Sequence, residues 1–172
     1  MSEAVIRHRL ETQHDRVREH SSQLVNQRIT RAIQANLERC VREGRDAIVT
    51  RLAELDREWD IDRILMANFA IAGGAAYALG LERFSSAPLL GKPKTGLLYM
   101  LGAQFGFLLM HAAIGWCPPA AIWRRFGART KAEIEVERTV LLDALAADTS
   151  REAARHQQAA NPKPPPQQQI SS

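Results

Sequence analysis

Cysteine is scarce in this chain of 172 residues, which contains only Cys40 and Cys117. Two cysteines so far apart cannot form the disulfide framework that small secreted domains use in place of a large core. Both are expected to be free thiols facing a reducing compartment. The first 20 residues also lack an apolar run, so no signal peptide is expected and the later apolar segments must direct their own insertion.

Sequence signatures of catalysis are lacking as well. The chain has no phosphate-binding loop, no dinucleotide fingerprint and no catalytic triad motif. His8, His14 and His20 are six residues apart, a spacing that scatters them around a helix and does not gather them for a metal ion. The excess of basic residues begins after residue 62 and forms no basic arm. The sequence therefore predicts a protein that is not an enzyme, holds no metal or cofactor, and binds no nucleic acid.

Charge is missing from two long stretches. Residues 96–123 form a segment of 28 residues without Asp, Glu, Lys or Arg. Residues 64–81 form a second such segment of 18 residues. Roughly 20 helical residues cross a bilayer. We predict membrane helices over 64–81 and 96–115, joined by an exposed loop at 82–95, as a hairpin domain of residues 63–126. Helices buried in a soluble bundle are the alternative.

Basic residues flank these two segments unequally. Nine arginines and lysines lie on the outer flanks, whereas the connecting loop holds three. Because basic residues next to membrane helices favour the cytoplasmic side, both termini are predicted to be cytoplasmic. Trp59, Trp116 and Trp123 agree with this topology, since all three fall at the same predicted interface, where indole rings prefer to lie.

The regions on either side of the hairpin are polar but patterned. Residues 1–62 carry one apolar stripe in steps of four and three, with Gly44 filling its only gap, which predicts a long amphipathic helix from about residue 25 to the membrane. The stripe could bury itself in a coiled coil or against the membrane surface. A capping box, TKAE, predicts a short cytoplasmic helix over 130–147. The Pro- and Gln-rich residues 149–172 are predicted to be disordered.

Small residues suggest how the two membrane helices pack. Gly102 and Gly106 form a small-xxx-small face on the second helix, which allows another helix to approach closely. Ala70, Gly74 and Ala78 have the same spacing on the first helix. We predict that these two faces pack together in the hairpin.

Four polar residues of the hairpin are candidate functional residues. Gln104 and His111 are seven apart and lie about 180° from the small face, so they would meet lipid unless a second copy covers them. This predicts a homo-oligomer, most simply a dimer. Asn68 could form a structural hydrogen bond with His111. Cys117, which precedes two prolines, either marks the end of the helix or carries reactive sulfur.

Four short motifs carry a resemblance to a known family. They are WDIDR at 59–63, GWCPP at 115–119, RRFG at 124–127 and RTKAEI at 129–134. With these motifs the chain resembles the YgaP-like inner-membrane transmembrane domain family over roughly residues 56–138. The resemblance implies a bacterial inner-membrane hairpin, dimeric packing and a link to sulfur metabolism through Cys117. The rhodanese domain that some members carry is absent from this sequence.

Together these patterns predict an all-α protein with two candidate functions. In the first, the hairpin anchors and oligomerises a cytoplasmic helical region, which associates with itself or binds an unidentified cytoplasmic protein, and the lipid bilayer is its other partner. In the alternative, a small membrane oligomer handles sulfide or persulfide with Cys117 and His111.

Overall fold

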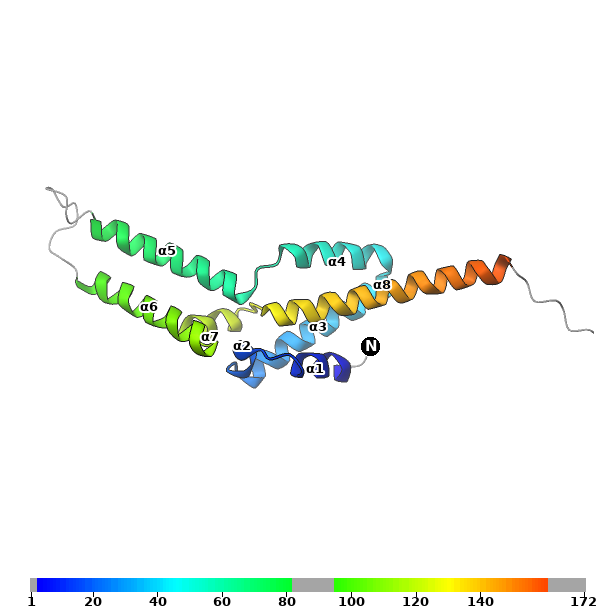
Figure 1. Cartoon of the computed structure of the whole chain (residues 1–172), viewed down its shortest axis with the longest axis horizontal. Helices are drawn as coiled ribbons and strands as arrows, with labels where there is room; N and C mark the ends of the chain where they lie inside the picture. The colour runs from blue at the N-terminus through cyan, green and yellow to red at the C-terminus, as the bar shows by residue number, and fades with distance from the viewer. Residues whose placement is uncertain (1–2, 82–94, 161–172) are drawn as a thin grey trace, which may run out of the picture.

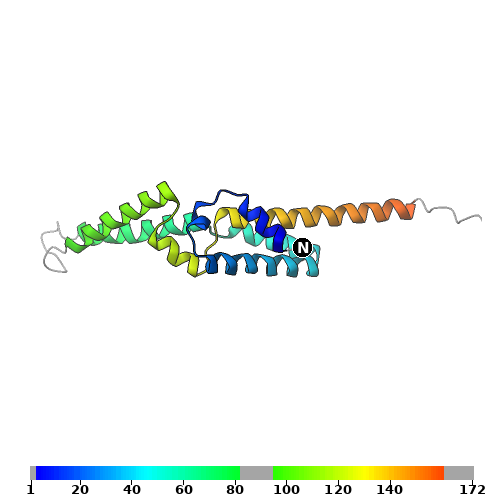
Figure 2. The same cartoon turned by 90° about the horizontal axis from the view of Figure 1, so that it is seen from below.

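The computed structural model describes residues 3–81 and 95–160, and all its regular structure is α-helical, so the predicted all-α class is confirmed. The helices form an elongated molecule in which one helical hairpin projects from one end of a bundle (Figures 1 and 2). In chain order they are α1 Glu3–Glu11, α2 Arg16–Glu19, α3 Gln23–Glu43, α4 Arg45–Arg57, α5 Ile61–Leu81, α6 Thr95–Ile114, α7 Pro118–Arg125 and α8 Lys131–Ala160.

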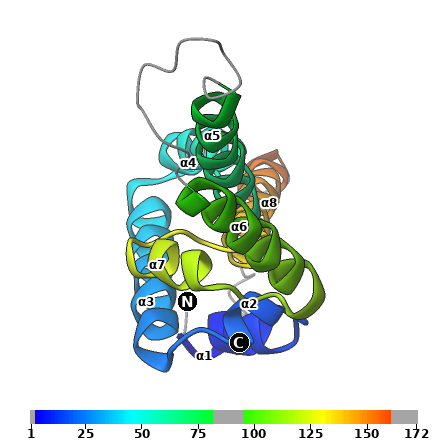
Figure 3. The same cartoon turned by 90° about the vertical axis from the view of Figure 1, so that its left-hand side faces the viewer.

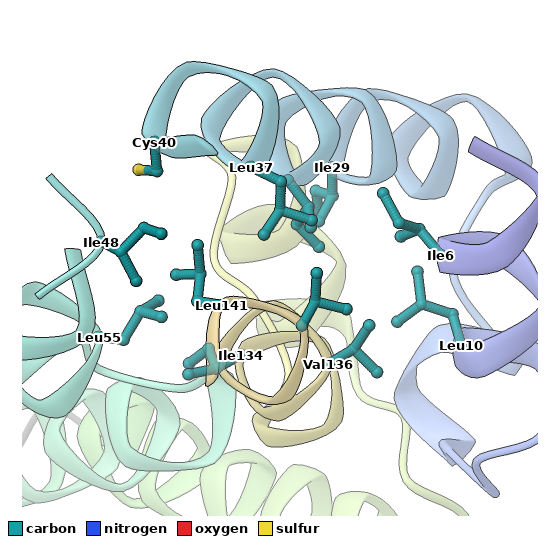
Figure 4. Close-up of a cluster of buried hydrophobic side chains, with 12 residues drawn as sticks. Ile6, Leu10, Ile29, Leu37, Cys40, Ile48, Leu55, Ile134, Val136 and Leu141 are labelled. Atoms are coloured by element: carbon teal, nitrogen blue, oxygen red, sulfur yellow. The ribbon is translucent and has the colours of Figure 1, made fainter. Parts of the chain in front are cut away.

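The bundle consists of α1, α3, α4 and α8: the last three contact one another, and α1 contacts α3 and α8. Its core is the predicted apolar stripe of α3 and α4, which meets apolar residues of α1 and α8 (Figure 4). Burying a large aliphatic side chain contributes about 1.5–3 kcal/mol. Because α1 and α8 of the same chain cover the stripe, it is not buried in a coiled coil or on a membrane surface. The buried residues of the whole core, from all four helices, are Ile6, Leu10, Ile29, Ile33, Leu37, Cys40, Ile48, Leu55, Ile134, Val136, Val140 and Leu141.

The predicted single long helix is wrong, because the chain reverses at Gly44. This residue has a φ of 95° and a ψ of −166°, a conformation that side chains with a Cβ rarely adopt. Its N–H donates to the carbonyl of Cys40 at 2.9 Å, and α4 begins at the next residue. The reversal lays α4 beside α3, so the stripe closes on itself as two antiparallel helices.

The capping box at the start of α8 is confirmed. The N–H of Glu133 donates to the Thr130 hydroxyl at 3.2 Å, and the N–H of Thr130 donates to the Glu133 carboxylate at 3.0 Å. The helix runs past the predicted end at residue 147 to Ala160, so the predicted disorder is wrong for 149–160. That extension contains no glycine or proline and is rich in good helix formers. Residues 161–172 lie outside the described residues.

The hairpin consists of α5 and α6, which lie side by side close to the predicted bounds of 64–81 and 96–115. Almost all of the predicted loop lies outside the described residues. Among the described residues, no single helix is long and apolar enough to cross a membrane on its own. The pair Tyr99–Ile114 and Pro118–Arg125, bent by 76°, has the length and composition to do so.

Candidate functional site

The contact between α5 and α6 differs from the predicted one. All five small residues expected to form it are exposed: Ala70, Gly74, Ala78, Gly102 and Gly106. The inward face of α6 carries Gln104 instead, whose amide lies against Gly73, so that a Cβ on that glycine would be 3.5 Å from the Gln104 oxygen. The prediction failed because sequence spacing identifies the faces of a helix but not the face that turns towards its neighbour.

Gln104 and His111 share one face of α6, but that face meets α5 of the same chain. Gln104 Nε2 donates to the carbonyl oxygen of Phe69 at 2.7 Å, and His111 Nε2 lies 2.9 Å from a carboxylate oxygen of Asp62. The expectation that these two side chains face outward is therefore wrong. Asp62 takes the place predicted for Asn68, which is half-buried six residues further along α5.

His111 and Asp62 line a cleft of about 630 Å³ at the base of the hairpin. Figure 3 views the molecule from the tip of the hairpin towards its base, and in this view α2 and α7 lie close to the end of α6. The apolar pattern predicts a helix only from about residue 25, yet α2 and the residues just before it form one wall of the cleft. The polar residues lining it are His14, Asp15, Arg16, Asp62, His111, Thr130 and Lys131.

The position of α2 against the hairpin is fixed by Asp15 and Arg16. Asp15 caps α2 by accepting the N–H of Arg18 at 3.0 Å, and its other oxygen accepts the hydroxyl of Thr130 at the start of α8. Arg16 Nη1 donates to the carbonyl of Ala113 near the end of α6 at 3.3 Å. These bonds hold the walls of the cleft together across segments that are about 100 residues apart in the chain.

Behind the cleft lies a buried ionic cluster centred on Glu133, whose side chain is 0% exposed. Arg124, itself 2% exposed, reaches both of its carboxylate oxygens, at 2.5 and 2.9 Å. Arg18 adds a third bond at 2.8 Å, and Arg124 also donates to Asn26 and Ser21. The cluster joins α2, together with α3 and α8 of the bundle, to α7, which follows the hairpin.

Burial and ion pairing act in opposite directions on Glu133. Burial raises the pKa of its carboxyl, but hydrogen bonds from Arg124 and from the N–H of Thr130, together with the charges of Arg124 and Arg18, outweigh it. The net result is that the pKa of Glu133 lies below its ordinary value of 4.5. Glu133 is therefore ionised at neutral pH and serves as a structural anion.

A second buried carboxylate, Glu137, makes a similar connection one helical turn later. It accepts Arg51 of α4 at 2.7 Å and also pairs with Arg129, which in turn pairs with Glu58. The two clusters connect the segments that enter and leave the hairpin, on either side of α5 and α6, to the bundle. A buried pair need not add net stability, but its geometry does fix how the parts are oriented.

Cys117 lies away from the polar lining of the cleft, in the N-cap position of α7 rather than at the end of α6. It is fully buried in an apolar cluster with Val17, Ile61 and Ala120. Burial raises the pKa of its thiol, and the hydrogen bond from the N–H of Ala120 opposes this only in part. A buried, protonated thiol is a poor nucleophile.

Both native cysteines are therefore expected to be unreactive in the folded protein. In mild detergent, Cys40 and Cys117 should react with a maleimide at least about 100-fold more slowly than in SDS, because a thiol in a packed core needs an unfavourable local opening. The control is a Leu24→Cys variant, whose position is 78% exposed and whose new thiol should react at once. Equally fast labelling of either native thiol would contradict the observed burial.

Within the described residues, no group of three or more His, Cys, Asp or Glu side chains is placed to hold a metal ion. Comparison with protein-family models, with curated proteins and with solved structures finds no match to this chain. Any functional assignment must therefore come from the geometry of the hairpin, the cleft and the bundle.

Proposed function

We propose that the α5–α6 hairpin inserts into the bacterial inner membrane and holds the helical bundle at the cytoplasmic surface, where the bundle associates with itself or binds a protein partner. The observation that carries this proposal is the exposure of large apolar side chains on both helices. Six of them are between 62% and 78% exposed: Met66, Ile71, Tyr77, Tyr99, Phe105 and Leu109.

A bilayer explains this surface better than water does. Contiguous apolar patches of this kind are rare on soluble monomers, and residues 64–81 and 96–123 contain no charged side chain to interrupt the patch. Among the described residues, most ion pairs lie in and around the bundle, and the pair of His111 with Asp62 lies at the base of the hairpin. Lipid tails would cover the hairpin from all sides without the need for a partner of defined shape.

Aromatic and basic residues at the base of the hairpin support the same orientation. Trp59 precedes α5, Trp116 follows α6, and Trp123 lies in α7. The guanidinium of Arg63 lies 4.7 Å from the centre of the Trp59 ring. Indole rings and arginines are typical of the interface between lipid headgroups and water.

The oligomer stays part of the proposal, but its predicted contact changes. Gln104 and His111 are occupied within one chain, so they no longer give a reason for a second copy to bind there. The small face of Gly102 and Gly106 is open, since a Cβ on either residue would meet nothing within 4 Å. We therefore place the contact between hairpins on this small face. No observation favours the sulfur-handling alternative, because the Cys117 thiol is buried.

Membrane extraction and topology labelling of the full-length chain test this proposal. The protein is expected to stay in the membrane fraction in carbonate and high salt and to require detergent for release. In intact spheroplasts, an impermeant maleimide should label a Ser86→Cys variant, and it should label a Leu24→Cys variant only after lysis. Release by carbonate, or labelling of both variants from the same side, would sink the proposal.

A further inference from the structure

The cleft at the base of the hairpin is amphipathic. The wall formed by the hairpin is mainly apolar, with Leu65, Met66 and Leu108 beside the hydrogen-bonded pair of His111 and Asp62. Met66 is 62% and Leu108 40% exposed, so this wall is open to the surroundings of the hairpin. The opposite wall, formed by the residues around α2 and the start of α8, contributes Arg16 and Lys131. The cleft is thus mainly apolar on the side of the hairpin, whereas Arg16 and Lys131 lie on the opposite side together with Asp15.

Hydrogen-bonding capacity in the cleft favours an anion. Its two carboxylates are already engaged, Asp15 with two donors and Asp62 with His111. Arg16 has five N–H donors, and one of them is used on the carbonyl of Ala113. Lys131 is exposed in the first turn of the 30-residue helix α8, where the helix dipole adds positive potential.

His111 also lines the cleft, and its Nδ1 is buried without a hydrogen-bond partner among the described residues. Because that nitrogen is itself enclosed, a molecule in the cleft does not reach it. The donors that remain for an anion are those of Arg16 and Lys131.

We infer that this cleft binds the headgroup of one anionic phospholipid, with its phosphate between Arg16 and Lys131 and its acyl chains along Met66 and Leu108. The inference rests on the proposed function, because the apolar wall meets lipid tails only when α5 and α6 are inserted. A phospholipid matches this arrangement. Its apolar acyl chains would lie beside the hairpin, and its anionic headgroup would lie beside α2 and the start of α8.

The test compares phosphatidylglycerol with phosphatidylcholine as ligands of the full-length protein. Native mass spectrometry from mild detergent is expected to show one preferentially retained phosphatidylglycerol. An Arg16→Gln/Lys131→Gln variant should bind it roughly 30-fold more weakly, since each basic residue near the headgroup contributes about fivefold. An Arg39→Gln/Arg155→Gln variant removes the same charge from exposed positions outside the cleft and should bind within about twofold of the wild type.

The single variant Lys131→Gln is the control for loss of folding. It alters an exposed side chain, so it should fold normally and weaken lipid binding about fivefold. Equal retention of both lipids, or equal weakening in the Arg39/Arg155 control, would overturn the inference. Inorganic phosphate that saturates the same site in the absence of lipid would also overturn it, in favour of a soluble anion. Carbonate extraction reports separately on the hairpin: failure there would sink the proposed function, whereas failure of lipid selectivity alone would leave it standing.

Discussion

Replacing Glu133 with Gln is expected to lower the free energy of unfolding by about 3–5 kcal/mol. The substitution keeps the shape of the side chain but leaves Arg124, which is 2% exposed, with its charge buried and uncompensated. Removing one partner of a buried ion pair is among the most destabilising single changes. Urea unfolding of the full-length protein in mild detergent, followed by tryptophan fluorescence, measures the effect.

Two matched variants test whether the loss of stability comes from the unpaired buried charge of Arg124 or simply from the loss of a carboxylate. Glu54→Gln removes an exposed carboxylate that pairs with Arg51, and no measurable change is expected. Arg124→Leu combined with Glu133→Gln removes the uncompensated charge together with its partner, so it should be less destabilised than the sum of the two single variants. Additive losses would show that the buried charge is not the source of the effect.

Acid should remove the same stabilisation in the wild type. Because the pKa of Glu133 is lower in the folded than in the unfolded protein, its contribution is fully present above the ordinary value of 4.5. The contribution is lost as the pH falls through the lower folded-state value. Wild-type stability should therefore fall more steeply below about pH 4 than that of the Glu133→Gln variant. Parallel pH profiles would argue against a lowered pKa.

Local signals in the sequence were sufficient to locate the elements around the hairpin. The two charge-free stretches locate α5 and α6, although α5 begins earlier, at Ile61, and includes Asp62 and Arg63. The start of α8 follows from the reciprocal bonds of Thr130 and Glu133. Both signals act within a few turns of one helix. The apolar stripe likewise identified the buried face of α3 and α4, but periodicity does not say which element covers a face. The reversal at Gly44 decided that, and it placed the partner within the same chain.

The candidate site depended on tertiary contacts that no local pattern encodes. Arg124 and Arg125 are two of the nine basic residues counted on the outer flanks of the hairpin, yet Arg124 is buried against Glu133. A signal was present: Glu133 and Glu137 are four residues apart and lie on the same side of α8 as Ile134 and Leu141. Two carboxylates on an apolar face require buried cations, and the arginines nearby were the available partners.

The sequence pattern also does not determine how α6 is rotated about its own axis relative to α5. Spacing correctly placed Gln104 and His111 on one face and Gly102 and Gly106 on another. It could not decide which face turns towards α5, because both close packing of small residues and satisfied polar groups favour helix contacts. In this hairpin the polar groups face inward, and Asp62 at the start of α5 provides the partner for His111.

Replacing Gly115 with Ala is the second change expected to have a large effect. Gly115 lies between α6 and α7 with a φ of 75°, and an added Cβ would lie 2.3 Å from the Cβ of Arg16. The left-handed conformation is unfavourable by about 1–2 kcal/mol for a residue with a Cβ. Overpacking adds about 1–3 kcal/mol, because the contact includes the backbone of Arg16, which cannot move as a flexible side chain can.

Gly127→Ala is the control that separates these two contributions. Gly127 has a φ of 95°, but a Cβ on it would meet nothing within 4 Å, so only the conformational cost of about 1–2 kcal/mol is expected. Unfolding in mild detergent should therefore show a larger loss for Gly115→Ala than for Gly127→Ala. The difference measures how tightly α2 is packed against the end of the hairpin. Equal losses would mean that α2 moves away freely, and the wall of the cleft that carries Arg16 would then not be fixed.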